Sequence, residues 1–293
     1  NEVSSNAEDT DMIPYGAKHV WIPAENGDEL SAWLVTPKGV FMLQDNPFPI
    51  VVMAHGFGNQ KDMGLIQYAE SFSEIGIAAL LIDYRSFGGS SRNNWKIRNY
   101  LNPWHHVEDI VASVRYVRSD AFSEDNIDPN SIALWGTAYA GGHVIMAAEA
   151  LGPDHIRGVV AQAPFLDGRA AAWNTIKRGG VIRAIQFTSL AVTDYLRHML
   201  RLSPLYVKII SDNASDVSYL TVSSEDFAVY SSKHPKKFLG GWENKAPARS
   251  MFMLSFYSPM KHIDNVEVPI LFIAAGADQF SPYDIAVDSL KKV

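Results

Sequence analysis

The sequence contains one turn whose residue types could support acyl transfer. An apolar run over residues 132–135 leads into a stretch of small residues around Ala138: Gly136, Ala140, Gly141 and Gly142. A nucleophile elbow needs such a turn, because the side chain at its tip is held above the sheet in a strained conformation and only small neighbours leave it room. In the G-x-S-x-G spacing the nucleophile falls at position 138. That residue is alanine, which has no group that can attack a carbonyl.

Two more glycine-containing segments follow apolar runs. They are residues 55–62, His-Gly-Phe-Gly-Asn-Gln-Lys-Asp, and residues 83–90, Asp-Tyr-Arg-Ser-Phe-Gly-Gly-Ser. Together with the turn at Ala138, they resemble the α/β-hydrolase superfamily, and within it the branch of dienelactone hydrolases, X-Pro dipeptidyl-peptidase-like esterases and fungal polyketide transferases. The resemblance covers residues 50–164 and 269–282 and is loose between them. It implies an α/β-hydrolase fold whose residue 138 would be serine in an active form.

The resemblance also implies an acid and a base. In this superfamily the chain order is nucleophile, acid, histidine, and Asp278 lies where the acid is expected, just past the apolar run over residues 269–275. The alternative is that Asp278 only caps a helix that begins near Pro282. No histidine follows Asp278, and one more strand would be expected, so we expect the base and that strand to lie outside these 293 residues. His234 and His262 are loose substitutes for the base.

Two backbone N–H groups would stabilise the oxyanion that forms in acyl transfer. The superfamily pattern points to Tyr139, the residue after the nucleophile, and to Phe57 in the turn after residue 54. Gly56 and Gly58 flank Phe57 and would let that turn approach a substrate closely. A plain strand-to-helix loop would not require both glycines, so the resemblance implies an oxyanion hole made by Phe57 and Tyr139.

The sequence carries no cofactor signature. It has no H-E-x-x-H, no paired Cys/His cluster and no P-loop, and the segment 88–90 is too short to hold a phosphate. We therefore expect neither a metal nor a nucleotide cofactor. Asp83, Tyr84 and Arg85 precede that segment, and we interpret them as a local Asp–Arg turn network rather than as catalytic residues.

Apolar runs and helical patterns alternate along most of the chain. Residues 17–23 and 30–36 are expected to form an antiparallel hairpin, because Asn26-Gly27 between them favours a tight turn. Buried strands are expected over residues 49–54, 77–82, 132–135 and 158–163, with helices over residues 61–75, 104–117 and 144–151 between them. This alternation predicts a mostly parallel, doubly wound sheet that is covered by helices on both faces. Residues 269–275 add one more strand.

The pattern changes at residue 165. Residues 165–262 are rich in aromatic residues and helical patterns, including one over residues 182–202, and we expect them to form a helical cap inserted after the sixth strand. The core would then be residues 1–164 and 263–293. The cap holds 13 Lys and Arg against 7 Asp and Glu, a balance of +6. A basic cap would favour an anionic or carrier-bound substrate, and the alternative is a solvated charged face.

Composition limits the class of protein. With 47% hydrophobic and 19% charged residues, the chain can bury a sizeable core. A net charge of −7 argues against nucleic-acid binding. The absence of cysteine excludes disulfides and a cysteine nucleophile but does not fix a compartment. There is no apolar run long enough to predict a membrane span. The start at Asn1 is compatible with a removed leader.

These observations leave more than one functional reading. The first is a serine hydrolase that acts on a small-molecule ester, thioester or lactone through an acyl-enzyme, present here with alanine in place of the nucleophile. The same triad could serve an acyl or polyketide transferase. The third reading is a natural non-catalytic member that binds a ligand in the same pocket. The residue that the unmodified gene encodes at position 138 distinguishes the first two readings from the third.

Overall fold

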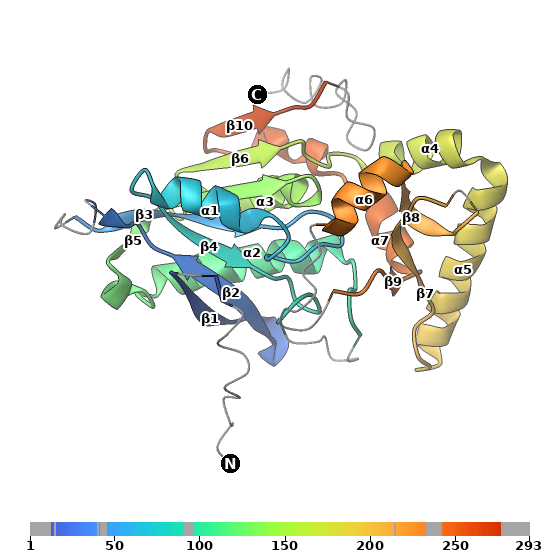
Figure 1. Cartoon of the computed structure of the whole chain (residues 1–293), viewed down its shortest axis with the longest axis horizontal. Helices are drawn as coiled ribbons and strands as arrows, with labels where there is room; N and C mark the ends of the chain where they lie inside the picture. The colour runs from blue at the N-terminus through green and yellow to red at the C-terminus, as the bar shows by residue number, and fades with distance from the viewer. Residues whose placement is uncertain are drawn as a thin grey trace, which may run out of the picture.

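The computed structural model of the chain describes residues 13–14, 16–39, 41, 46–90, 97–213, 215–232 and 242–276. A seven-stranded sheet in the order β1-β2-β4-β3-β5-β6-β10 forms its centre (Figure 1). β1 (Ala17–Pro23) and β2 (Glu29–Val35) are antiparallel, and β2 is also antiparallel to β4 (Ala78–Ile82). The other pairs are parallel and involve β3 (Phe48–Ala54), β5 (Ile127–Thr137), β6 (Gly158–Gln162) and β10 (Ile270–Ile273). The predicted fold class is confirmed.

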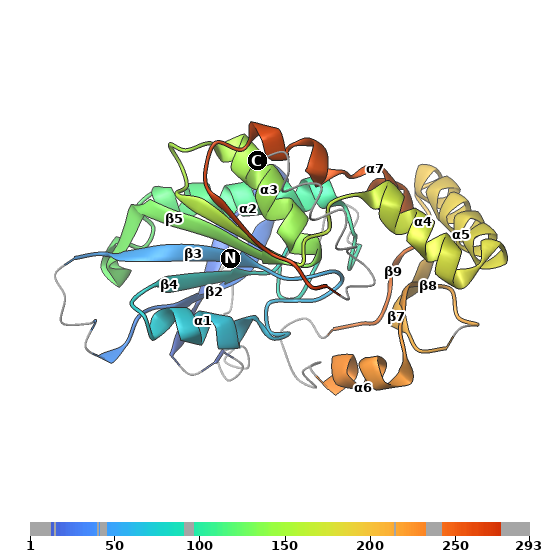
Figure 2. The same cartoon turned by 90° about the horizontal axis from the view of Figure 1, so that it is seen from above.

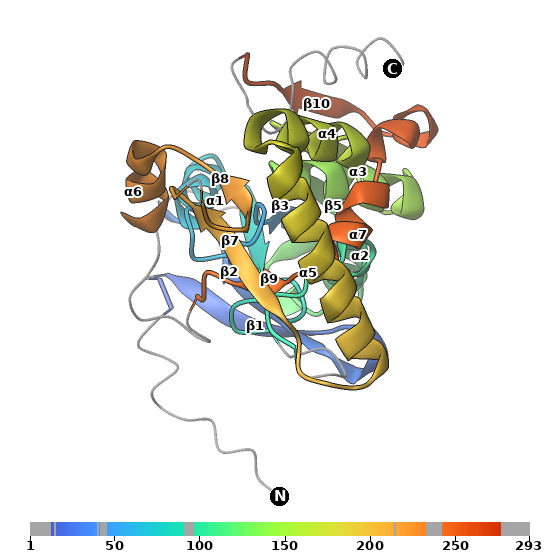
Figure 3. The same cartoon turned by 90° about the vertical axis from the view of Figure 1, so that its right-hand side faces the viewer.

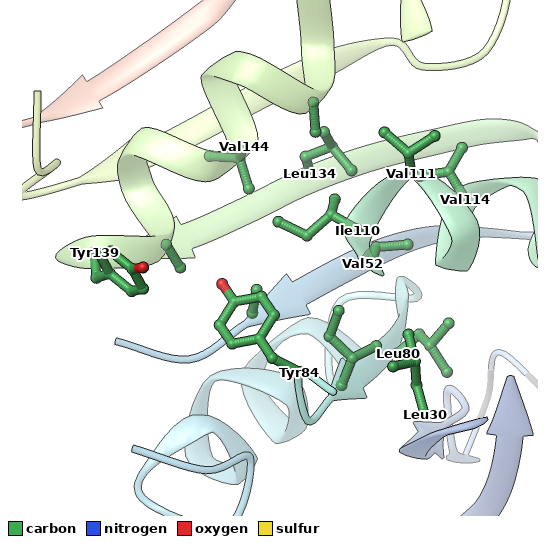
Figure 4. Close-up of a cluster of buried hydrophobic side chains, with 14 of the residues drawn as sticks. Leu30, Val52, Leu80, Tyr84, Ile110, Val111, Val114, Leu134, Tyr139 and Val144 are labelled. Atoms are coloured by element: carbon green, nitrogen blue, oxygen red, sulfur yellow. The ribbon is translucent and has the colours of Figure 1, made fainter. Parts of the chain in front are cut away.

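Helices cover both faces of this sheet. α1 (Leu65–Ser73) lies on one face, and α2 (Pro103–Arg118) and α3 (Tyr139–Leu151) lie on the other (Figure 2). Alternate residues of β3 belong to different clusters: Val51 and Met53 pack with α1, whereas Ile50 and Val52 pack into the larger cluster beneath α2 and α3 (Figure 4). Both faces of the strand are therefore apolar, which is why these strands are continuous hydrophobic runs in the sequence.

The register of the sheet brings three strand ends together. Ala54 at the end of β3 is opposite both Ile82 of β4 and Gly136 of β5. The segments that begin at His55, Asp83 and Thr137 consequently leave the sheet at the same edge. In open parallel sheets this carboxyl edge is where ligands bind.

The segment from residue 165 to 262, called the cap segment below, contains helices and a small sheet. Its helices are α4 (Gly168–Gly179), α5 (Val181–Met199), α6 (Ser224–Ser232) and α7 (Ser250–Phe256). β7 (Tyr206–Ser211), β8 (Ser218–Thr221) and β9 (Ala246–Pro247) form a separate sheet in the order β8-β7-β9. Figures 1 and 3 show α4 to α6 beyond the carboxyl ends of the core strands. The sequence predicted helices here but not the sheet, and the boundaries of a cap domain stay a prediction.

Helix boundaries differ slightly from those expected, for local reasons. α2 begins at Pro103 because the Asn102 side chain accepts a hydrogen bond from the Trp104 N–H (3.2 Å) and proline suits a first helical position. α5 ends at Met199, close to Arg201, whose φ of 56° is left-handed. The helix expected from Pro282 lies outside the described residues. Among the helices that are described, none is long and apolar enough to cross a membrane.

Candidate active site

Ala138 lies between the end of β5 and the start of α3. Its φ of 52° and ψ of −113° are strained values for an alanine. Main-chain hydrogen bonds hold it on both sides: the Ala138 N–H donates to the Gln162 carbonyl (2.8 Å), and the Ala138 carbonyl accepts from the Phe165 N–H (2.9 Å). The strain is therefore fixed by the end of β6 and the residues after it. The side chain is half-buried, so position 138 remains accessible.

The glycines around Ala138 are required by close contacts. A Cβ on Gly136 would overlap the Ala140 carbonyl, and a Cβ on Gly141 would be 2.8 Å from the Pro164 Cα. A Cβ on Gly142 would overlap the Phe165 carbonyl. These contacts explain physically why small residues surround the turn in the sequence.

The turn after β3 approaches the same point. A Cβ built on Gly56 would be 3.7 Å from the Ala138 Cβ, so the two backbones nearly touch. The Phe57 ring is half-buried and makes an edge contact with the Tyr139 ring at 5.3 Å between centroids. Tyr139 is the first residue of α3, where N–H groups have no partner within the helix and attract negative charge. The structure thus brings Phe57 and Tyr139 together beside Ala138, and their role in an oxyanion hole stays a prediction.

None of the residues predicted as the acid or the base of the triad is found beside position 138 in the described part of the chain. Asp278 and His234 lie outside the described residues. His262 Nδ1 is 2.7 Å from Glu149 Oε2, and Glu149 is ten residues after Tyr139, roughly 15 Å along α3. This distance removes His262 from the candidates for a base at position 138.

Three buried histidines are tied into the core behind the turn. His55 Nδ1 donates to the Gly56 carbonyl (3.1 Å), and its Nε2 accepts from the Tyr84 N–H (3.5 Å). Burial lowers the pKa of His55 to about 4. His143 shares a hydrogen bond with the Tyr257 hydroxyl (2.7 Å), and burial holds the pKa of His143 and His106 well below the usual range. These neutral rings have structural positions behind the turn.

Tyrosines join these histidines in one fully buried cluster. The Tyr84 ring stacks on His106 at 4.3 Å, and the Tyr139 ring meets His143 edge-on at 4.0 Å. Figure 4 shows Tyr84 and Tyr139 near the ends of β4 and β5, and the His106 ring contacts both, at 4.3 Å and 5.7 Å between centroids. This cluster was not predicted from the sequence, because its members come from separate segments and only spatial contact relates them.

The expected Asp–Arg turn network is wrong. Asp83 pairs with Lys61, at 2.5 Å and with both side chains buried, and it also accepts hydrogen bonds from the Lys61 N–H (2.7 Å) and the Gly89 N–H (3.0 Å). Burial alone would raise the pKa of Asp83, but Lys61 holds that pKa below its usual range. Arg85 pairs instead with Asp109 of α2 at 2.6 Å. The Asp83 and Lys61 pair joins the turn after β4 to the turn that carries Phe57.

The cap segment contacts the Phe57 turn directly. The Trp242 Nε1–H donates to the Gly58 carbonyl (2.7 Å), and the Tyr230 hydroxyl donates to Asn59 Oδ1 (2.6 Å). The Tyr219 ring packs on Phe57 with 5.6 Å between centroids. The cap segment therefore packs against the turn beside Ala138. Among the described residues, no group of three His, Asp or Glu side chains is arranged for a metal.

A strained strand-to-helix turn at the carboxyl edge of this sheet order defines an α/β hydrolase. The chain belongs to the hydrolase family described as serine aminopeptidase, S33, whose family model matches residues 45–293. It is 30% identical over 234 residues to the quorum-quenching protein AidA of Acinetobacter baumannii (strain MDR-ZJ06), covering 80% of this chain and 71% of AidA.

Other relatives are named thiohydrolases, polyketide transferases and an esterase. Thiohydrolase aneE of Aspergillus aculeatus (strain ATCC 16872 / CBS 172.66 / WB 5094) is 34% identical over 111 residues, which is 38% of this chain and 33% of aneE. The crystal structure of the α/β hydrolase GrgF from Penicillium sp. sh18 matches with a TM-score of 0.74 at 20% identity, covering 94% of this chain and 86% of GrgF. The predicted superfamily and its polyketide-transferase branch are confirmed.

Proposed function

We propose that this chain is a form of a serine hydrolase that cleaves an ester or thioester through an acyl-enzyme on residue 138, with alanine in place of the nucleophile. The backbone at Ala138 carries the proposal. Its left-handed φ, fixed by hydrogen bonds to Gln162 and Phe165, is maintained although an alanine gains nothing chemically from it. Strain of this kind, on the order of 1–3 kcal/mol, is concentrated at functional sites.

The proposed reaction assigns a role to each residue near this turn. A serine oxygen at position 138 would bond to the substrate carbonyl carbon while a base takes its proton. The N–H groups of Phe57 and Tyr139 would stabilise the oxyanion, aided by the positive end of α3. The alcohol or thiol would leave with the proton, and water would then release the acid from the acyl-enzyme. Asp278 would orient the base.

Thioesters are included in the substrate class for two reasons. Relatives named thiohydrolases and polyketide transferases belong to the same superfamily. The cap segment also presents aromatic side chains, among them Tyr219, Tyr230 and Trp242, to the Phe57 turn. Apolar walls with a few polar groups suit an acyl chain or a ring. The same acyl-enzyme could pass its acyl group to an acceptor other than water.

The test restores the nucleophile. Ala138→Ser is made in the full-length protein, and Ala150→Ser serves as the matched control because Ala150 is exposed near the other end of α3. Both are treated with a fluorophosphonate and assayed on a panel of esters, thioesters and lactones. We expect one adduct on position 138, by intact mass and peptide mapping, and turnover at least ~10³-fold above the alanine form.

Two outcomes would reject the proposal. Turnover without an adduct at position 138 would mean that the nucleophile lies elsewhere. Neither adduct nor turnover across the panel, with ligand binding retained by the alanine form, would favour the non-catalytic ligand-binding reading.

A further inference from the structure

The outer face of α5 is uncharged and largely apolar. The inner face of this helix is buried in the cap segment, where Phe187 packs on Tyr219 (4.9 Å between centroids) and Asp194 pairs with Arg249 (3.0 Å). The most exposed residues of α5 are uncharged, and its two arginines, Arg183 and Arg197, are half-buried. Figure 3 shows α5 running along the front of the cap segment on the side turned to the viewer. A 19-residue helix with no charged residue among its exposed positions is unusual for a face that meets only water.

The apolar residues on this face have the spacing of a helix-pairing seam. Five large side chains and one serine follow one another at intervals of three and four residues: Ile182, Ile185, Ser189, Val192, Leu196 and Met199. Alternation of three and four is the repeat that places successive side chains against a partner helix. The large members are between 44% and 76% exposed, so the seam is not used within the described part of the chain.

The exposed apolar area matches a standard protein interface. Ten large apolar residues on α4, α5 and the turn that follows are at least 44% exposed. A whole side chain of this kind has about 60–120 Å² of apolar surface. Because each of the ten is about half exposed, together they expose roughly 500 Å² of apolar surface. An interface of standard size buries about 800 Å² per partner, of which about 60% is apolar.

Charge and geometry favour a second copy of this chain over a membrane. Helices that lie on membranes carry Lys and Arg on a solvated polar face, whereas the opposite face of α5 is packed into the cap segment. A two-fold interface presents the same patch twice, so it must be self-complementary. An uncharged seam meets that requirement, because no like charges meet when it faces itself.

We propose that α5 forms the contact of a two-fold symmetric dimer, packing antiparallel against α5 of a second copy. Ser189 lies near the middle of the seam, so the two-fold axis passes close to it. Its small side chain allows the helices to approach there. The proposal is independent of the chemistry at position 138.

The absence of cysteine makes this geometry directly testable. Ser189→Cys in the full-length protein, oxidised with diamide, is expected to give a disulfide-linked dimer on non-reducing gels, because the axis places the two thiols together. Ser71→Cys on the exposed side of α1 is the matched control and should give no disulfide-linked band on the same gels. The mass of the unmodified protein by sedimentation equilibrium should be that of a dimer, and Ile185→Glu with Leu196→Glu should raise its dissociation constant by at least ~100-fold.

The variants change exposed residues, so the secondary structure that circular dichroism reports should be unchanged by them. A monomer at ~100 µM, a concentration at which interfaces of this size associate, would overturn the proposal. A dimer that survives the double variant, or that does not crosslink at position 189, would also overturn it. If the protein is a monomer that binds phosphatidylserine vesicles, the dimer is rejected and the partner of this face is a lipid surface.

Discussion

At the scale of single residues, the backbone conformation at position 138 does not depend on whether its side chain is reactive. Ala138 keeps a conformation that costs an alanine free energy, because hydrogen bonds from β6 and close contacts at Gly136 and Gly141 determine it. A different side chain at this position would be presented in the same way, at the first turn of α3.

A thiol at position 138 should be more acidic than one at the far end of the same helix. The chain has no cysteine, so Ala138→Cys and the control Ala150→Cys each contain a single thiol. The N-terminus of α3 stabilises a thiolate and its C-terminus opposes one, so we expect the thiol pKa to be at least ~1 unit lower at position 138. The pH dependence of alkylation by iodoacetamide measures both values. Equal or reversed values would show that position 138 does not face the helix terminus as described.

His55 should make the folded state sensitive to acid. Burial lowers the pKa of His55 to about 4, against 6.5 when unfolded, with Asp83 and Lys61 acting in opposite directions. Between pH 6.5 and 4 the unfolded chain binds a proton that the folded chain does not, so stability falls as the pH falls. The loss is about 3 kcal/mol. Urea unfolding from pH 7 to 4 should show this loss in the wild type relative to His55→Gln, and parallel curves would contradict it.

At the scale of elements, the turns at the sheet edge are held by a buried ion pair between segments that are 22 residues apart. Lys61 also donates to Ser31 of β2 (2.8 Å), so three strand ends share one charge network. Gly88 completes it, because a Cβ there would overlap the Asp83 carboxylate. The pair therefore fixes the turn that carries Phe57.

Removing one member of this pair should destabilise the fold strongly. Asp83→Asn or Lys61→Met leaves a buried charge without its partner, and each should cost about 3–5 kcal/mol. The double variant should cost less than the sum, with a coupling of about 2–3 kcal/mol in urea unfolding. Lys18 and Asp125, an ion pair whose lysine is 56% exposed, are the control, and their coupling should stay below about 1 kcal/mol. Similar couplings for the two pairs would refute this account.

The sheet could be predicted from the sequence because a strand that is buried on both faces is a continuous hydrophobic run within one segment. The runs over residues 49–54 and 77–82 became β3 and β4, and the elbow glycines were identified from spacing. Contacts between distant segments leave no such pattern. Three findings depend on tertiary placement: the pairing of Asp83 with Lys61, the small sheet β8-β7-β9, and the exclusion of His262 as a base for position 138. Asp278 stays a prediction.

At the scale of the whole molecule, the cap segment and the core share one wall of the candidate site. Phe187 of α5 packs on Tyr219, and Tyr219 packs on Phe57 of the core turn. Asn99 of the core donates to the Glu243 carbonyl (3.0 Å) and to the Lys245 carbonyl (2.9 Å), which ties the end of the cap segment to the core as well. Under the proposed function, such contacts would make substrate preference a property of both parts.

Trp242→Phe should therefore change substrate preference more than stability. The change keeps an aromatic ring but removes the Nε1–H that donates to the Gly58 carbonyl, at a cost of about 1 kcal/mol in unfolding free energy. In the Ala138→Ser background, the ratio of kcat/KM for long and short acyl thioesters should shift by roughly fivefold or more, because a loosened Phe57 turn no longer fixes the acyl position. Trp173→Phe, at a residue of α4 that is 58% exposed, is the control and should leave the ratio unchanged. An equal ratio in all three proteins would mean that the cap segment does not set specificity through this turn.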